Sequence, residues 1–283
     1  MTADKPIGVF DSGVGGLTVL KALRERLPGE SLIYLGDTAR LPYGTKSAAT
    51  VSAYALQAAD ALVSLGIKAL VVADNTSSAH ALDVLRARFP GLPVVGVVEP
   101  GAVAAGHASP HGRIVVIATE SAVRTGTYPR SILHARPAAR VAQVPCQLFV
   151  SLVEEGIVEG PIAEQVARHY LAPLLLDPPD SERGDCLLLG CTHFPALVPL
   201  LRRVFGPKVV IVDSATTTAR AVEEVLENRH LAAPSSGRPA SVRYLVTDAP
   251  DRFARVSKIF VPWAIAPDGI ETIELETLPE TAG

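Results

Sequence analysis

The sequence predicts an α/β protein with two doubly wound domains built on mainly parallel sheets. Short runs of Val, Ile, Leu and Ala alternate with helical patterns along almost the whole 283-residue chain. These runs are continuous instead of alternating with polar residues, which is typical of parallel strands covered by helices on both faces. At roughly 150 residues per domain, the length favours two domains.

The apolar runs are the candidate strands, and they cover residues 6–10, 32–35, 69–73, 94–97, 114–118, 140–144, 186–189 and 209–212. The helical patterns between them cover residues 17–27, 49–65, 79–89, 162–171 and 217–228. Ser47 and Ser214 are cap-type residues just before two of these helices. Right-handed crossovers then place helices on both faces of each sheet. The proline-containing stretches 178–181 and 234–237 are predicted surface loops.

Composition excludes several classes of protein. Apolar residues make up 48% of the chain and charged residues 19%, which is too hydrophobic for a disordered protein. The apolar runs fall short of the roughly 18 residues that a membrane span needs. With 26 basic and 29 acidic residues and no basic block, nucleic acid and anionic membranes are poor partner candidates. The N-terminus lacks a secretory pattern and the three cysteines are odd in number, so we expect reduced thiols in the cytoplasm.

The first segment that can carry chemistry is the turn 10–17, FDSGVGGL, after the first strand. Its glycines permit a tight turn and expose backbone amides at a helix N-terminus, where an anion can bind. A dinucleotide site would need a third glycine where this chain has Thr18, and Asp11 is a poor neighbour for a pyrophosphate. A nucleotide site is therefore disfavoured, and a plain strand–helix turn remains the alternative.

Two other segments follow predicted strands. The loop 35–44, LGDTARLPYG, lies at the carboxyl edge of the sheet, where open α/β sheets bind ligands. In the stretch 190–195, GCTHFP, Cys191 stands between a strand and a helix N-terminus, which favours the thiolate. His193 can orient or protonate a group in the same pocket. An inert buried thiol is the alternative for Cys191.

The other cysteines and histidines give no further site. Cys146 and Cys186 are expected to be structural. The remaining histidines lack the spacing of metal ligands and are expected to be solvated; they are His80, His107, His111, His134, His169 and His230. The segments 72–76, VADNT, and 189–193, LGCTH, are similar strand–helix turns. Either two such turns face each other across a cleft, or the similarity is chance.

Five segments, in this order, resemble the cofactor-independent glutamate racemases: 7–17 (IGVFDSGVGGL), 34–46 (YLGDTARLPYGTK), 75–79 (NTSSA), 96–101 (GVVEPG) and 189–195 (LGCTHFP). The resemblance implies interconversion of L- and D-glutamate for peptidoglycan of the bacterial cell wall, without pyridoxal phosphate or metal. It also implies two pseudo-symmetric α/β domains, formed by residues 1–97 with 211–283 and by residues 98–210. The active site is expected in the cleft between them, and the chain is expected to form a homodimer.

The resemblance assigns roles to residues at matching motif positions. Cys191 becomes one of two catalytic bases, assisted by His193, and Asp11 supports proton transfer. The implied substrate-binding residues are Ser12, Pro42, Tyr43, Gly44, Asn75, Thr76, Thr119, Thr192 and Glu154.

Two positions depart from the family pattern. Asp74 stands where the family has its other catalytic cysteine, and Ala122 stands where it usually has a threonine. With usual pKa values of about 3.9 and 8.5, an Asp is a weaker base than a Cys by roughly 6 kcal/mol, although burial raises its pKa. A carboxylate at position 74 also faces an anionic substrate. The lost hydroxyl at Ala122 removes about 1 kcal/mol of expected substrate hydrogen bonding.

The sequence thus predicts a glutamate racemase impaired at Asp74. Two alternatives remain open. A relative with Cys191 as its only catalytic thiol would be a decarboxylase or isomerase of another small acid. A protein that binds glutamate without turnover would be a pseudoenzyme with a regulatory role.

Overall fold

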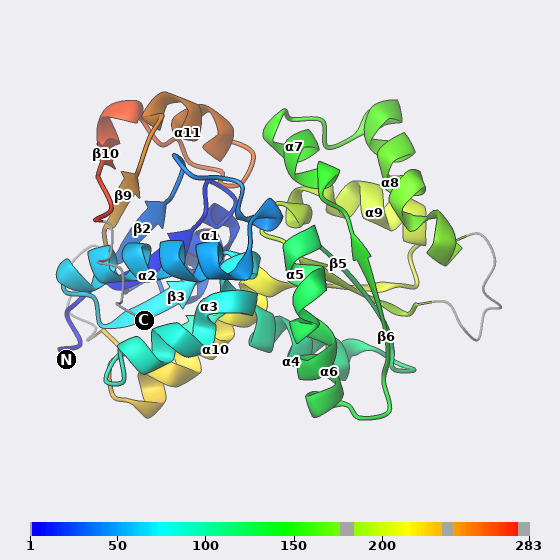
Figure 1. Cartoon of the computed structure of the whole chain (residues 1–283), viewed down its shortest axis with the longest axis horizontal. Helices are drawn as coiled ribbons and strands as arrows, with labels where there is room; N and C mark the ends of the chain where they lie inside the picture. Colours follow the sequence, from blue (N-terminus) through cyan, green and yellow to red (C-terminus); the bar gives the residue numbers. More distant parts are fainter. Residues whose placement is uncertain (1, 176–183, 234–239, 277–283) are drawn as a thin grey trace.

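Two parallel sheets lie side by side in the computed structural model, which describes residues 2–175, 184–233 and 240–276 (Figure 1). The six-stranded sheet has the order β10-β9-β2-β1-β3-β4 and the four-stranded sheet the order β6-β5-β7-β8. The first comprises β1 (Ile7–Asp11), β2 (Leu32–Gly36), β3 (Ala69–Val72), β4 (Val94–Gly96), β9 (Val242–Val246) and β10 (Ile270–Thr272). The second comprises β5 (Arg113–Ala118), β6 (Arg140–Pro145), β7 (Cys186–Gly190) and β8 (Val210–Asp213). The predicted fold class is confirmed.

Helices cover the sheets. Around the first sheet lie α1 (Leu17–Arg26), α2 (Ala48–Ser64), α3 (Asn75–Arg88), α10 (Ser214–Asn228) and α11 (Pro250–Ser257). Around the second lie α4 (Val98–Ala108), α5 (Glu120–Thr125), α6 (Thr127–Ala135), α7 (Leu148–Glu154), α8 (Gly160–Leu175) and α9 (Val198–Phe205). The short 3₁₀ helices are η1 (Tyr43–Thr45), η2 (Phe194–Leu197) and η3 (Pro267–Gly269).

Burial on both faces explains why β1 reads as a continuous apolar run. Val9 belongs to the apolar cluster that includes α1, whereas the next residue, Phe10, belongs to the cluster formed with α2 and α3. Successive side chains of a strand point to opposite faces, so a sheet covered on both sides needs apolar residues at both. The carboxyl edge is left for polar residues.

The predicted helix starts are partly wrong. Ser47 does cap α2, because its hydroxyl accepts a hydrogen bond from the Thr50 backbone N–H at 3.3 Å. However, α10 begins at Ser214 itself, and the cap is Asp213, whose carboxylate accepts from two backbone N–H groups. Likewise, α3 begins at Asn75, four residues before the predicted start, because Asp74 caps it.

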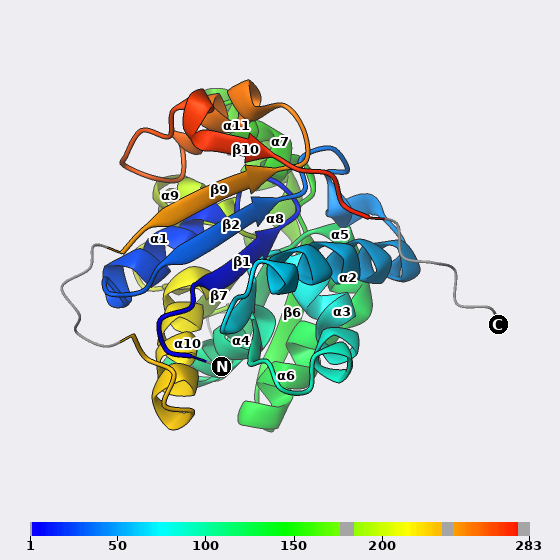
Figure 2. The same cartoon turned by 90° about the vertical axis from the view of Figure 1, so that its left-hand side faces the viewer.

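The C-terminal segment returns to the first sheet, where β9 pairs with β2 and β10 with β9 (Figure 2). The predicted boundary at residue 211 falls inside β8, which pairs with β7 of the four-stranded sheet. The division into domains 1–97 with 211–283 and 98–210 stays a prediction. The predicted loops 178–181 and 234–237 lie outside the described residues. Among the described helices, none combines the length and apolar character that crossing a membrane requires.

Candidate active site

A small cavity lies between the two halves of the molecule, and its lining residues come from both. Four of its polar side chains follow the carboxyl ends of central strands, namely Ser12 after β1, Asp74 two residues after β3, Thr119 after β5 and Cys191 after β7. The lining residues are Ser12, Gly13, Leu41, Pro42, Tyr43, Gly44, Asp74, Asn75, Thr76, Thr119, Gln147, Val150, Glu154, Cys191, Thr192 and His193. The carboxyl edges of the two parallel sheets therefore bring together residues that are far apart in the sequence.

Of the residues given a catalytic or substrate-binding role, only Asp11 is outside the cavity lining. It is buried at the end of β1, and its Oδ2 accepts a hydrogen bond from the Gly13 backbone N–H at 2.9 Å. Gln147 also lines the cavity, at the start of α7 after β6, and was not among the expected residues. Its place after a predicted strand is the signal that would have found it.

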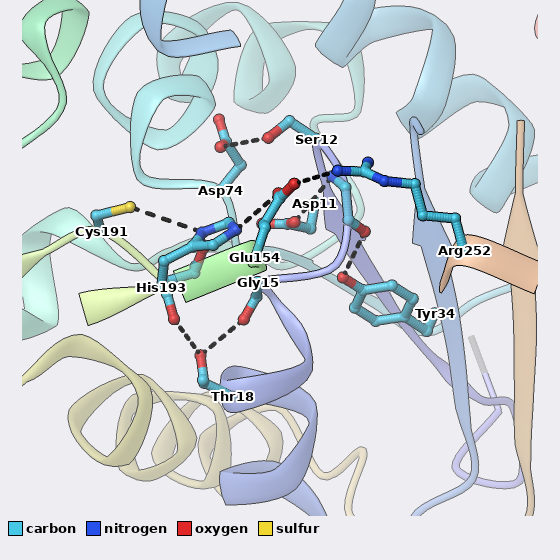
Figure 3. Close-up of polar contacts among 12 residues, drawn as sticks. Asp11, Ser12, Gly15, Thr18, Tyr34, Asp74, Glu154, Cys191, His193 and Arg252 are labelled. Atoms are coloured by element: carbon cyan, nitrogen blue, oxygen red, sulfur yellow. Dashed lines mark hydrogen bonds and ion pairs between the residues drawn. The ribbon is translucent and has the colours of Figure 1, made fainter. Parts of the chain in front are cut away.

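Asp74 is a buried helix cap as well as a cavity residue. Its Oδ2 accepts from the Ser77 backbone N–H at 2.6 Å. Figure 3 shows the other bond, in which its Oδ1 accepts from the Ser12 hydroxyl at 2.9 Å. Burial raises the pKa of Asp74, although the bonds from Ser77 and Ser12 and the charge of His193 oppose the rise. Both carboxylate oxygens are thus engaged, and the helix N-terminus favours the ionised form.

Asp11 lies behind this cap. Burial, with repulsion from Asp74, raises the pKa of Asp11 to about 7, while His193 and the Gly16 and Gly13 amides oppose the rise. Its Oδ1 has no hydrogen-bond partner within the described part of the chain. The turn is fixed from the other side, because the Tyr34 hydroxyl donates to the Gly13 carbonyl at 3.0 Å (Figure 3).

A chain of polar contacts leads away from Cys191 (Figure 3). Its Sγ is 3.9 Å from Nδ1 of His193, and Nε2 of the same ring is 3.1 Å from Oε1 of Glu154. The second oxygen of Glu154 accepts from Nη2 of Arg252 at 2.7 Å. Cys191 is itself 7% exposed and therefore reachable from the cavity.

These contacts determine the ionisation states of His193 and Glu154. Burial alone would lower the pKa of His193, but Cys191 and Glu154 outweigh it and raise the pKa to about 10. Burial would raise the pKa of Glu154, but His193 and Arg252 outweigh it and lower the pKa. An imidazolium and a carboxylate are therefore the forms expected at neutral pH, and the imidazolium is next to the thiol.

At the N-terminus of α3, polar side chains of one half contact polar side chains of the other. The Asn75 side-chain amide donates to the Tyr128 hydroxyl at 2.6 Å, which leaves the buried Asn75 Oδ1 without a partner among the described residues. The hydroxyls of Thr76 and Thr119 are 3.1 Å apart. An unpaired buried acceptor beside the cavity is suited to an ammonium group.

Three other expectations of the sequence analysis have outcomes here. Ala122 is fully buried in an apolar cluster and does not line the cavity, so its assignment to the pocket is wrong. His80 is half-buried, with Nε2 at 2.9 Å from the Ser121 hydroxyl, so it is not simply solvated. Cys146 and Cys186 are fully buried, and burial raises the pKa of each thiol. The described residues contain no cluster of three or more His, Cys, Asp or Glu that could hold a metal.

Comparison with known proteins gives consistent matches. The family model described as Asp/Glu/Hydantoin racemase matches residues 7–222. A glutamate racemase of Geobacter metallireducens is 46% identical over 258 residues, which cover 91% of this chain and 93% of the relative. The structure of glutamate racemase from Francisella tularensis in complex with D-glutamate superposes with a TM-score of 0.88 at 34% identity, covering 98% of this chain and 100% of that one. Glutamate racemase from Thermus thermophilus, in complex with β-chloro-D-alanine, gives a TM-score of 0.85 at 41% identity with the same coverage.

Proposed function

The chain belongs to the glutamate racemase family, and on that premise we propose that it interconverts L- and D-glutamate through Cys191 and Asp74. One group removes the α-proton from one face of the substrate and the other returns a proton to the opposite face. The observation that carries the proposal is that these two side chains line one cavity from two different sheets. The D-glutamate formed would serve peptidoglycan synthesis, and no cofactor takes part.

The Cys191 side is equipped for both directions of transfer. The neighbouring imidazolium of His193 stabilises the thiolate that accepts the α-proton, and a neutral thiol returns it. Glu154 holds the imidazole ring in place through Nε2. The unpaired Oδ1 of Asn75 is the proposed acceptor for the substrate ammonium. The hydroxyls of Ser12, Thr76, Thr119 and Thr192, with the 42–44 segment, are the proposed contacts of the substrate carboxylates.

The Asp74 side is the slow one. A protonated carboxyl gives up its proton readily to a carbanion, but a carboxylate is a far weaker base than a thiolate. Asp74 also has both oxygens engaged by Ser12 and by the N-terminus of α3, so its movement toward a substrate would break the cap. We infer that removal of the α-proton by Asp74 limits the rate.

The test compares the unmodified protein with D74C and D74N in deuterated water. Racemisation and α-deuterium incorporation are followed for each glutamate enantiomer. D74C is expected to raise the racemisation rate by orders of magnitude, while losing about 1 kcal/mol of stability with the cap. D74N has no group at position 74 that can transfer the proton, so it is expected not to racemise glutamate. The absence of exchange in both the unmodified protein and D74C would overturn the proposal.

We also propose a homodimer in the cytoplasm. The family resemblance supports the dimer, and three free buried thiols support a reducing compartment. Sedimentation equilibrium of the purified protein tests the dimer, because a single species at the monomer mass of 29.7 kDa would contradict it. Fractionation of the source cells tests the location.

A further inference from the structure

We propose that Arg252 is a positioning residue for the Cys191 half of the reaction, acting by clamping Glu154 across the cleft so that Glu154 holds His193 against Cys191. The inference rests on the proposed function and extends it to a residue outside the cavity lining and outside every motif of the sequence analysis. The contact joins a helix of the six-stranded half to a helix of the four-stranded half.

Arg252 comes from the returning C-terminal segment, on α11. Glu154 is the last residue of α7, in the half built on the four-stranded sheet. The two helices face each other across the gap between the halves (Figure 1), and the guanidinium Nη2 reaches Oε2 of Glu154 at 2.7 Å. The other carboxylate oxygen, Oε1, remains for His193 at 3.1 Å. One carboxylate thus serves two cations at once.

Burial makes the second partner necessary. The Glu154 side chain is only 11% exposed, and a buried carboxylate oxygen without a partner carries a large desolvation cost. Arg252 satisfies that oxygen and fixes the plane of the carboxylate, which in turn fixes the direction of Oε1. The Arg252 side chain is 39% exposed, so its guanidinium can hydrogen-bond to water when it does not contact Glu154. Its importance is therefore positional.

The same segment supports His193 a second time. The Phe260 ring meets the His193 ring edge to face, with centroids 5.3 Å apart and an interplanar angle of 85°. The charged and titratable groups that face His193 are Asp11 at the end of β1, Asp74 at the α3 cap, Cys191 after β7 and Glu154 on α7. Removal of the Arg252 cation frees Glu154 to leave His193, and it also subtracts one positive charge from the surroundings of the Cys191 thiolate.

The experiment measures alkylation of Cys191 by iodoacetamide at pH 7, followed by mass spectrometry of the Cys191 peptide. Only the thiolate reacts, and Cys146 and Cys186 are fully buried, so the signal reports Cys191. We expect R252Q to slow alkylation about tenfold, equivalent to about 1.4 kcal/mol, and R252K to restore most of the rate. The matched control is R255Q, an exposed arginine of the same helix, which should react like the unmodified protein.

A double-variant cycle tests the route of the effect. E154Q alone should also slow alkylation, and R252Q combined with E154Q should be no slower than E154Q. Additive losses, or alkylation of R252Q at the unmodified rate or faster, would overturn the proposal. Circular dichroism confirms that each variant is folded. Alkylation needs no turnover, so a protein without any α-proton exchange would refute the racemase function while the alkylation rates still decide the role of Arg252.

Discussion

Asp11 is a carboxyl group whose ionisation the fold opposes. Burial and the nearby Asp74 raise the pKa of Asp11 from 3.8 to about 7. Between these two pH values the folded chain keeps a proton that the unfolded chain has already released. Folding stability therefore falls as pH rises through this window, and the loss levels off above about pH 7. A carboxyl that titrates near neutrality behind the site is also able to respond to proton transfer in front of it.

The D11N variant removes this titration while keeping an oxygen for the Gly13 N–H. Urea unfolding of both proteins from pH 4.5 to 8 should show the unmodified protein losing stability relative to D11N, by an amount on the order of 2–4 kcal/mol. D4N, at an exposed aspartate near the N-terminus, is the control and should show no such trend. A constant difference between D11N and the unmodified protein across the range would contradict the assignment.

At the scale of elements, the sequence predicted the strands and helices whose burial makes their local composition apolar. The strands β1 and β7 are apolar at nearly every position because both faces are covered, so they were found. The strand β9 is only partly buried over its first three residues and β10 has only three residues, so neither was predicted. The helix α4 contains Pro100 and Gly101, which disfavour helix, so it was not predicted either. A Cβ at Gly101 would lie only 3.0 Å from the Ser214 hydroxyl. Tertiary packing selected the glycine there.

The site residues also fall into those that the sequence could predict and those that it could not. Positions directly after strands, such as Cys191 and Asp74, could be located from the chain order alone. The partners that tune them could not, because Arg252 is 98 residues from Glu154 in sequence and meets it only through the returning segment. Ala122 shows the reverse error, since its motif position suggested the pocket but its side chain packs in the core.

The segment that carries Tyr43 is anchored by one hydroxyl, that of Thr247 directly after β9. Thr247 accepts from the Ala39 backbone N–H at 2.9 Å and donates to Oδ1 of the buried Asp37 at 2.9 Å. Asp37 in turn accepts from the Tyr43 hydroxyl, and it binds Arg40 Nε at 2.7 Å. The C-terminal segment thereby steadies a wall of the cavity.

T247V removes both hydrogen bonds of that hydroxyl with little change of shape. We expect a loss of about 1–2 kcal/mol of stability and a severalfold weaker affinity for D-glutamate, because the 42–44 segment becomes less ordered. Calorimetry gives the affinity and urea unfolding gives the stability. T272V, at an exposed threonine of β10, is the matched control and should change neither. Affinity equal to that of the unmodified protein would show that this anchor does not shape the site.

At the scale of the whole molecule, the two halves approach so closely that side chains are excluded at two places. A Cβ at Gly15, after β1, would lie 2.5 Å from Nδ1 of His193. A Cβ at Gly44 would lie 2.9 Å from Cβ of Thr119 and 3.0 Å from the Gln147 side-chain oxygen. In each case the glycine belongs to the six-stranded half and its neighbours to the other. The two halves can therefore approach this closely, and the cavity can keep its width, only with glycine at positions 15 and 44.

G44A tests whether this close approach sets the geometry of the site. The added methyl must push the halves apart or displace Thr119, and overpacking of this kind costs about 1–3 kcal/mol. Because substrate binding needs both halves in register, we expect most of that cost in binding, as a tenfold to hundredfold weaker affinity for D-glutamate at about 1.4 kcal/mol per tenfold. The melting temperature should fall by only a few degrees, since each half keeps its own apolar core. G91A, where a Cβ would meet nothing within 4 Å, is the control and should alter neither quantity. Unchanged affinity in G44A would mean that the halves adjust freely around the substrate, and that the cavity is shaped by its side chains and not by the distance between the two sheets.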